Sequence, residues 1–103
     1  MSKRPKTAEE YAELVRQTLF EVEQLRYGAE DDMDSMGEAL GLLDELETQV
    51  RSLWKSMEEG SYEFRDEDLP FMALVEHQSD TLLPFKSLLR RINTTHRQGL
   101  DAD

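Results

Sequence analysis

With 103 residues, the chain has the length of one domain, and its formal net charge of −11 makes it strongly acidic. That charge repels phosphate backbones and anionic membrane surfaces, so we expect no nucleic acid and no membrane among its partners. It contains no cysteine, which excludes disulfides, thiolate catalysis and cysteine-ligated metal. The basic start of the chain leads into an acidic helix instead of an apolar signal core, so we expect a soluble, cytoplasmic protein.

The first predicted helix covers residues 8–27. Apolar residues recur at three- and four-residue steps from Tyr11 to Leu25, and Thr7 with Glu10 has the form of a capping box, in which each side chain bonds the amide of the other residue. Gly28 is the expected end, because glycine enters the left-handed conformation without a steric penalty. Residues 1–6, before this helix, are a predicted flexible basic tail.

The second predicted helix covers residues 32–59, and the rest of the chain is organised around it. Gly60 and Ser61 are expected to end it. Its apolar residues fall on one side of a helix, a stripe that needs a partner: Met33, Met36, Leu40, Leu43, Leu46, Val50, Leu53, Trp54 and Met57.

A single longer helix is the alternative, because the heptad spacing continues across Gly28. A helix over residues 8–59 could not fold back on itself and would dimerise into a four-helix bundle. We favour the broken version, since an internal glycine costs about 1 kcal/mol and the neighbouring carboxylates would repel one another along a continuous helix.

The third predicted helix covers residues 69–96. Asp68 or Leu69 is expected to cap it, with Pro70 in the first turn, where its missing N–H does no harm. The apolar stripe keeps its spacing on both sides of Pro84, so we predict one helix that is kinked there instead of two helices. From Gly99 onward, residues 99–103 are a predicted flexible acidic tail.

Three amphipathic helices with short connections predict an all-α fold, an antiparallel three-helix bundle that residues 7–98 form as one domain. The distribution of charge agrees with this arrangement. Antiparallel packing of the last two helices would place basic residues of the third beside acidic residues of the second: Lys86, Arg90, Arg91 and Arg97 beside Asp34, Glu38, Asp44, Glu45 and Glu47. Pairing with these carboxylates would also neutralise the basic residues, which argues against a phosphate site there.

The acidic turn between the first two helices is the candidate metal site, with Asp31, Asp32 and Asp34 as the candidate ligands. Part of an EF-hand calcium loop is present, but Met36 and Leu43 stand at the fifth and twelfth positions, where ligands are required. Carboxylates at a helix N-terminus also match the helix dipole without any metal. A metal-binding protein or metal-dependent enzyme that uses this turn is therefore the alternative function.

The residues that could carry catalysis do not converge. His77, Ser79 and Asp80 are neighbours on one turn and cannot take the geometry of a catalytic triad. We expect His77 at the surface and His96 at the fraying end of the third helix. The sequence therefore predicts no enzyme and no cofactor.

Aromatic residues outside the helical stripes indicate a protein-binding surface. Tyr62 and Phe64 should fold over the end of the bundle, and with Leu69 and Phe71 they are the first candidate surface. A second candidate is the pair Phe20 and Tyr27, which lie away from the main face of the first helix. The predicted function is a non-enzymatic protein–protein interaction module that forms a homodimer and serves as an adaptor, a regulator or a chaperone-like binder.

Overall fold

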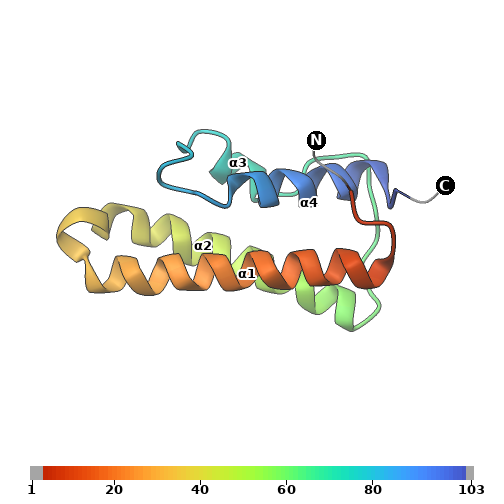
Figure 1. The fold of residues 1–103 in the computed structure, drawn as a ribbon, viewed down its shortest axis with the longest axis horizontal. Helices are drawn as coiled ribbons and strands as arrows, with labels where there is room; N and C mark the ends of the chain where they lie inside the picture. Colours follow the sequence, from red (N-terminus) through yellow and green to blue (C-terminus); the bar gives the residue numbers. More distant parts are fainter. Residues whose placement is uncertain (1–3, 102–103) are drawn as a thin grey trace.

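The computed structural model describes residues 4–101, apart from the side chains at 33–36 and 38. In chain order its helices are α1 (Ala8–Asp31), α2 (Met33–Glu58), α3 (Met72–Val75) and α4 (Lys86–Gln98) (Figure 1). No strand occurs among the described residues. The predicted all-α bundle is therefore confirmed, although its third helix has a different form.

α1 begins at the predicted cap. The amide of Glu10 donates to Oγ1 of Thr7 at 3.1 Å, while the carboxylate of Glu10 accepts from the amide of Lys6 at 3.0 Å instead of the expected amide of Thr7. The helix continues through Gly28 to Asp31, one turn beyond the predicted end. The reason is that Ala29 is fully buried, which extends the helical packing past the glycine.

α2 reverses direction at Asp32 and runs antiparallel to α1 (Figure 1). The alternative of one continuous helix over residues 8–59 is therefore wrong. α2 ends as predicted at Gly60, whose φ of +75° lies in the left-handed region that favours glycine. Fully buried residues of α1 and α2 face one another across the hairpin: Val15, Val22, Leu43, Leu46 and Val50.

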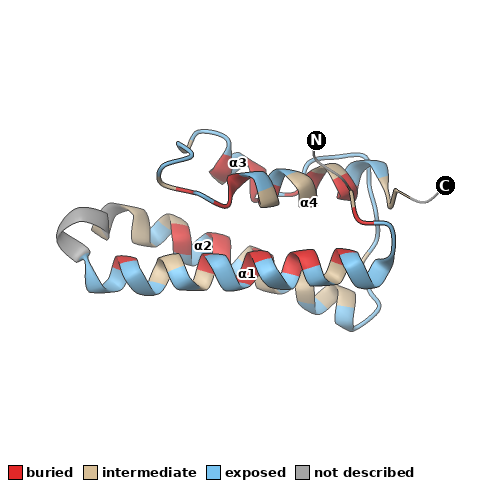
Figure 2. Ribbon diagram, viewed as in Figure 1, coloured by how far each residue is buried: buried red, intermediate tan, exposed pale blue. Residues whose placement is uncertain are grey.

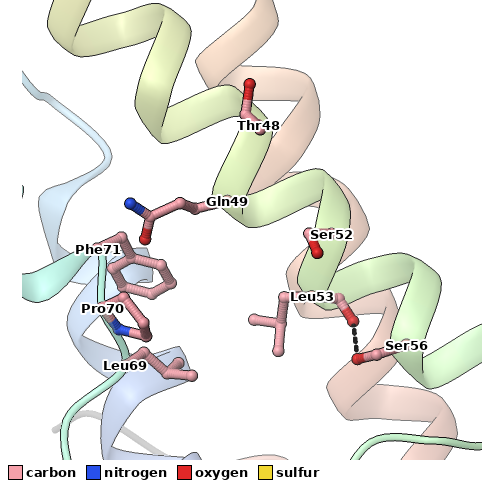
Figure 3. A pocket seen from close by; sticks show the side chains of 8 residues that line it. All are labelled: Thr48, Gln49, Ser52, Leu53, Ser56, Leu69, Pro70 and Phe71. Atoms are coloured by element: carbon pink, nitrogen blue, oxygen red, sulfur yellow. Dashed lines mark hydrogen bonds between the residues drawn. The ribbon is translucent and has the colours of Figure 1, made fainter.

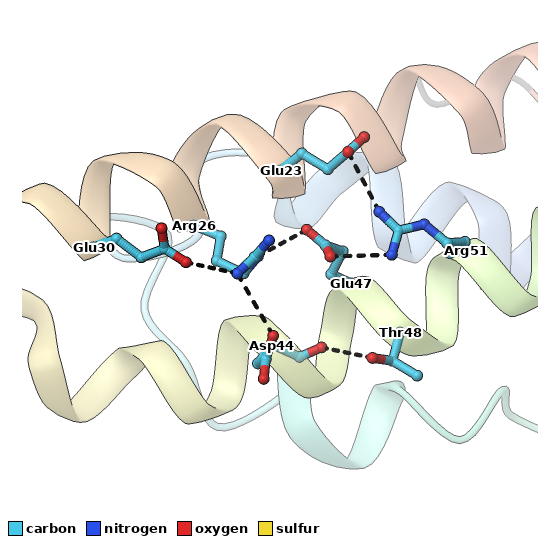
Figure 4. A network of polar contacts seen from close by, with 7 residues as sticks. All are labelled: Glu23, Arg26, Glu30, Asp44, Glu47, Thr48 and Arg51. Carbon is cyan, nitrogen blue, oxygen red and sulfur yellow. Dashed lines mark hydrogen bonds and ion pairs between the residues drawn. The ribbon is translucent and has the colours of Figure 1, made fainter.

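A network of ion pairs joins α1 to α2 (Figure 4). Glu47, only 5% exposed, accepts from Nε of Arg26 at 2.8 Å and lies 3.2 Å from Nη1 of Arg51. Arg26 also pairs with Glu30 at 2.7 Å, and Arg51 with Glu23 at 3.3 Å. The network fixes the register of the two helices, because each arginine bridges carboxylates on both of them.

A second layer covers one face of this hairpin (Figures 1 and 2). It consists of α3, α4 and the irregular chain that precedes and joins them. Figure 2 shows the buried positions of α1 on its side toward this layer. The layer contributes the other part of the core: Leu69, Phe71, Met72, Val75, Leu83, Phe85, Leu89 and Ile92.

The single kinked helix predicted over residues 69–96 is wrong, because the chain leaves α3 after Val75 and becomes helical again only at Lys86. The intervening residues from Glu76 to Thr81 are mostly exposed, so no continuous apolar face is present to support a helix there. Pro84 lies just before α4, where its missing N–H interrupts nothing. The predicted cap at Asp68 or Leu69 is also wrong, since α3 has no side-chain cap.

α4 runs antiparallel to α1 and in the same direction as α2 (Figure 1). The hydroxyl of Tyr11 donates to the carbonyl of Ile92 at 3.2 Å, and the amide of Asp101 donates to the carbonyl of Pro5 at 2.9 Å. The start of α1 therefore lies beside the end of α4. This direction follows because the chain after α2 returns along the hairpin in an extended conformation before α3 begins.

The predicted pairing of the basic half of the third helix with the acidic half of the second is therefore wrong. The carboxylates of Asp44 and Glu47 are directed to Arg26 on α1. Arg97 pairs instead with Asp66 and Asp68, both at 3.2 Å.

Candidate functional site

The residues of the first predicted surface divide between two places. Tyr62 and Phe64 fold against Tyr11 at the end of the bundle, as predicted, with ring centroids 5.5 and 5.7 Å from that of Tyr11. Phe64 remains 45% exposed. Leu69 and Phe71 instead enter the core against α2, so these four residues do not form one surface.

A chain of hydrogen bonds runs beneath the aromatic cluster. Nδ1 of His96 lies 2.7 Å from the hydroxyl of Tyr62, which lies 2.8 Å from the hydroxyl of Tyr11. One direction satisfies every contact: Nδ1–H of His96 donates to Tyr62, Tyr62 donates to Tyr11, and Tyr11 donates to the carbonyl of Ile92. The neutral histidine then carries its proton on Nδ1 and leaves Nε2 to titrate.

Burial changes the acid–base properties of this chain. It raises the pKa of Tyr11 far above its ordinary value, with a further contribution from Tyr62, and it also raises the pKa of Tyr62. Burial lowers the pKa of His96, which is 6% exposed, although the carboxylate of Glu67 opposes that shift. The prediction that His96 lies at a fraying helix end is therefore wrong. All three side chains hold their neutral forms at neutral pH, which suits a structural contact better than proton transfer.

A groove lies between α2 and the chain before α3 (Figure 3). It encloses about 400 Å³, within the range of small-molecule and side-chain pockets. Apolar side chains of Leu53, Leu69, Pro70 and Phe71 form most of its surface, and the polar residues Thr48, Gln49, Ser52 and Ser56 complete it along α2. Leu69 and Phe71 thus line a concave site although little of either is exposed.

Gln49 places a polar atom in this groove. Its Nε2 donates to Oε1 of Glu45 at 3.1 Å. Its Oε1 is buried and has no hydrogen-bond partner among the described residues. Figure 3 shows the amide group of Gln49 reaching across the groove toward Phe71. A buried carbonyl without a donor costs free energy, so a ligand that supplies an N–H or O–H would gain from the pairing when the amide of Gln49 turns to expose this oxygen to the groove.

Phe20 and Tyr27, the second predicted surface, remain exposed at 56% and 51%. They are seven residues apart on α1 and so share one side of it, opposite the core. The guanidinium of Arg26 lies 5.4 Å from the ring centroid of Tyr27 and shields part of it. These two residues therefore form a surface separate from the groove.

The acidic turn is described only in part. Asp31 and Asp32 are both exposed, and the side chain of Asp34 lies outside the described residues. Within the described part of the chain, no three histidine, aspartate or glutamate side chains lie close enough together to hold a metal ion. The described side chains of the turn, Asp31 and Asp32, therefore supply no metal site by themselves.

The basic residues of α4 are dispersed instead of forming a patch. Lys86 is buried, and its Nζ donates to the carbonyls of Gln78 at 2.6 Å and Glu76 at 3.4 Å. Arg97 is engaged by Asp66 and Asp68, as described above. Arg91 lies against α1, and its buried Nε has no partner among the described residues.

The chain matches no protein-family model, and comparison with curated proteins and solved structures finds no similar sequence or fold. Within residues 4–101, no helix combines the length and apolar character needed to cross a membrane. The role of the chain must therefore be argued from its own groove, aromatic surface and charge.

Proposed function

We propose that this chain is a non-enzymatic protein-binding module, and that the groove beside α2 receives an apolar side chain from a positively charged segment of a partner protein. The observation that supports this most strongly is the combination of an apolar floor at Leu53 and Phe71 with the unpaired carbonyl of Gln49. An apolar side chain would fill the floor, and an N–H of the same segment would satisfy the carbonyl.

Charge decides the class of partner. The whole chain carries a net charge of −11. On the α2 wall of the groove, the exposed residue Glu45 stands one turn before Gln49 and accepts from its Nε2. On the other wall, Asp68 precedes Leu69 but already pairs with Arg97 on α4. A surface with this net charge attracts lysine- and arginine-rich segments and repels acidic ones, which sets the encounter rate and the choice of partner. The absence of cysteine suits a reducing compartment, so we place this module in the cytoplasm as an adaptor or regulator.

Selection from a random displayed peptide library tests the proposal. We expect the selected peptides to share a large apolar residue flanked by lysine or arginine. Their binding should weaken with added salt, because charge contributes to it. In a two-dimensional NMR titration with one synthetic peptide from the selection, the largest shifts should fall on Gln49, Leu53 and Phe71.

Ser52 provides a matched pair of variants, because it lines the groove yet is exposed, so its substitution leaves the core intact. Ser52→Arg places a long cation at the entrance and should abolish binding of the selected peptides. Ser52→Glu also enlarges the side chain at this position but carries the complementary charge, so it should retain binding. The proposed function is overturned if no such peptides are enriched, or if they bind Ser52→Arg as tightly as the wild type.

A further inference from the structure

The outer side of α1 carries a stripe that is symmetric along the helix. Phe20 and Tyr27 occupy its middle, and Arg16 and Asp31, both exposed, stand one turn beyond them on either side, with Arg16 paired to Glu13 of the same helix. Residues four apart lie on the same face of a helix. Arg16, Phe20, Tyr27 and Asp31 are therefore arranged evenly about a point between residues 23 and 24.

A stripe with this spacing is complementary to itself when two copies pack antiparallel. A twofold axis at its midpoint places Phe20 of one chain against Tyr27 of the other, and Arg16 against Asp31, each contact occurring twice. Aromatic pairs across such an interface bury apolar area and favour offset or edge-to-face packing. Arg16 already pairs with Glu13 of its own helix, so at each end of the contact its guanidinium would be shared between Glu13 and Asp31 of the other copy. These pairs favour one direction and one register.

The middle of the stripe also suits a contact between equal copies. Glu23 is directed toward α2, where its carboxylate lies 3.3 Å from Arg51. Gln24, exposed and uncharged, is left beside the axis. Two copies therefore meet there without opposing carboxylates, although each chain is strongly acidic.

We infer that the chain forms an isologous homodimer through the outer side of α1, with Phe20 and Tyr27 at its centre. This surface shares no residue with the groove beside α2, so the inference goes beyond the proposed function and does not rest on it. Two aromatic side chains per copy make an interface at the small end of the known range, so we expect a weak dimer that dissociates on dilution.

Sedimentation equilibrium over a series of concentrations measures this association. The wild-type chain should show a monomer–dimer equilibrium, and a monomer at every concentration would overturn the inference. Phe20→Ser should weaken the dimer at least about tenfold, because central aromatic residues carry most of the free energy of such contacts. Far-UV circular dichroism should show unchanged helix content, since Phe20 lies outside the core. A dimer that is unaffected by this variant also overturns the inference.

A charge swap tests the register. Arg16→Asp should weaken the dimer several-fold because it sets two aspartates against each other at each end of the contact. Adding Asp31→Arg recreates both pairs in reversed order and should restore the wild-type affinity. Phe64→Ser removes an exposed aromatic residue from another part of the surface and should leave the dimer unchanged. Failure of the double variant to regain affinity, or equal weakening by Phe64→Ser, would contradict this interface.

Discussion

His96 ties the last turn of α4 to the rest of the molecule through the hydroxyl of Tyr62. Because burial lowers the pKa of His96, the folded state binds a proton less readily than the unfolded state, whose histidine keeps a value near 6.5. The charged and titratable groups around the ring are Glu67, whose carboxylate opposes the shift, and Arg65, which adds to it. Nδ1–H makes the same contact in both protonation states, so this hydrogen bond does not oppose protonation. The pKa of His96 is lowered chiefly because burial removes water from the charged ring.

We therefore predict that His96 makes stability depend on pH. The contribution of the buried, neutral His96 to the free energy of unfolding is complete above about pH 6.5. It is lost as the pH falls toward the lower pKa of the folded state. His96→Asn retains a donor near the position of Nδ1 but does not titrate, so its Tm should fall less than that of the wild type between about pH 7.5 and 5.5. Thermal melts by circular dichroism measure the difference.

The other histidine supplies the control. His77 is exposed in the turn after α3, so His77→Asn should keep the pH dependence of the wild type. Equal slopes for His96→Asn and the wild type would contradict the assignment of this pH dependence to His96.

The helix cap at Thr7 could be predicted from the sequence and the burial of His96 could not, because the partners of the two residues lie at different distances along the chain. The cap at Thr7 involves an amide three residues away, so the local sequence contains both partners. The surroundings of His96 come from Tyr62 and the amide of Arg65, which the chain brings back only after α2 has ended. No periodicity in the sequence reports such a contact, and the end of an amphipathic helix is exposed by default.

Among the charged residues of the α1–α2 hairpin, we expect Glu47 to contribute most to its stability. It is buried and receives arginines from both helices. We predict that Glu47→Ala lowers the free energy of unfolding by about 1–3 kcal/mol, because it leaves two guanidinium groups without their shared acceptor. Chemical denaturation measures the change. Glu58→Ala, which removes an exposed carboxylate from the same helix, should stay within about 0.5 kcal/mol of the wild type. A similar loss in both variants would show that net charge, not the network, is responsible.

Lys86 closes the connection between α3 and α4. Its Nζ is directed at the carbonyls of Glu76 and Gln78, which follow the last turn of α3 and have lost their helical partners. We predict that Lys86→Met, which keeps the length of the side chain and removes the donor, destabilises the fold by about 1–2 kcal/mol. The amides of residues 83 and 86 donate within this connection, so in the variant they should exchange faster than in the wild type, whereas hydrogen exchange in α1 should change less. Unchanged exchange there would mean that the ammonium group contributes nothing.

The break between α3 and α4 shows how far periodicity alone can be trusted. The spacing of apolar residues from Phe71 to Ile92 is helical, and most of them are in the core, although Leu74 and Leu82 are only partly buried. A helix and a turn can both present residues at such intervals, so the pattern predicted what is buried but not the backbone that buries it. Pro84 was a stronger signal than the phase, since a proline removes a hydrogen bond wherever a helix would continue.

The candidate sites were predictable to different degrees. Phe20 and Tyr27 lie off the apolar stripe of α1, and their exposure follows from that position. The groove depends on which segment packs against α2, because Gln49 lacks a partner only once Leu69 and Phe71 lie opposite it. The direction of α4 depends in the same way on the extended segment after Gly60. Sequence patterns therefore located surfaces on single helices, and missed the site that forms between elements.

The net charge of −11 acts on the molecule as a whole. Folding brings the surplus carboxylates closer together, so self-repulsion destabilises the compact state, and dissolved salt screens that repulsion. The pairs around Glu47 are buried and are screened much less. We predict that raising NaCl from about 20 mM to about 200 mM at neutral pH raises the Tm by a few degrees, measured by calorimetry on dilute protein.

The same experiment near the isoelectric point of about 4.5 separates the two electrostatic contributions. There the net charge vanishes and little repulsion remains to be screened, so added salt should leave the Tm unchanged or lower it as exposed ion pairs weaken. A Tm that falls with salt at neutral pH would instead mean that surface pairs such as Arg97 with Asp66 outweigh the surplus of negative charge. The acidic surface proposed to attract a basic partner would then exert less long-range attraction than the formal charge implies.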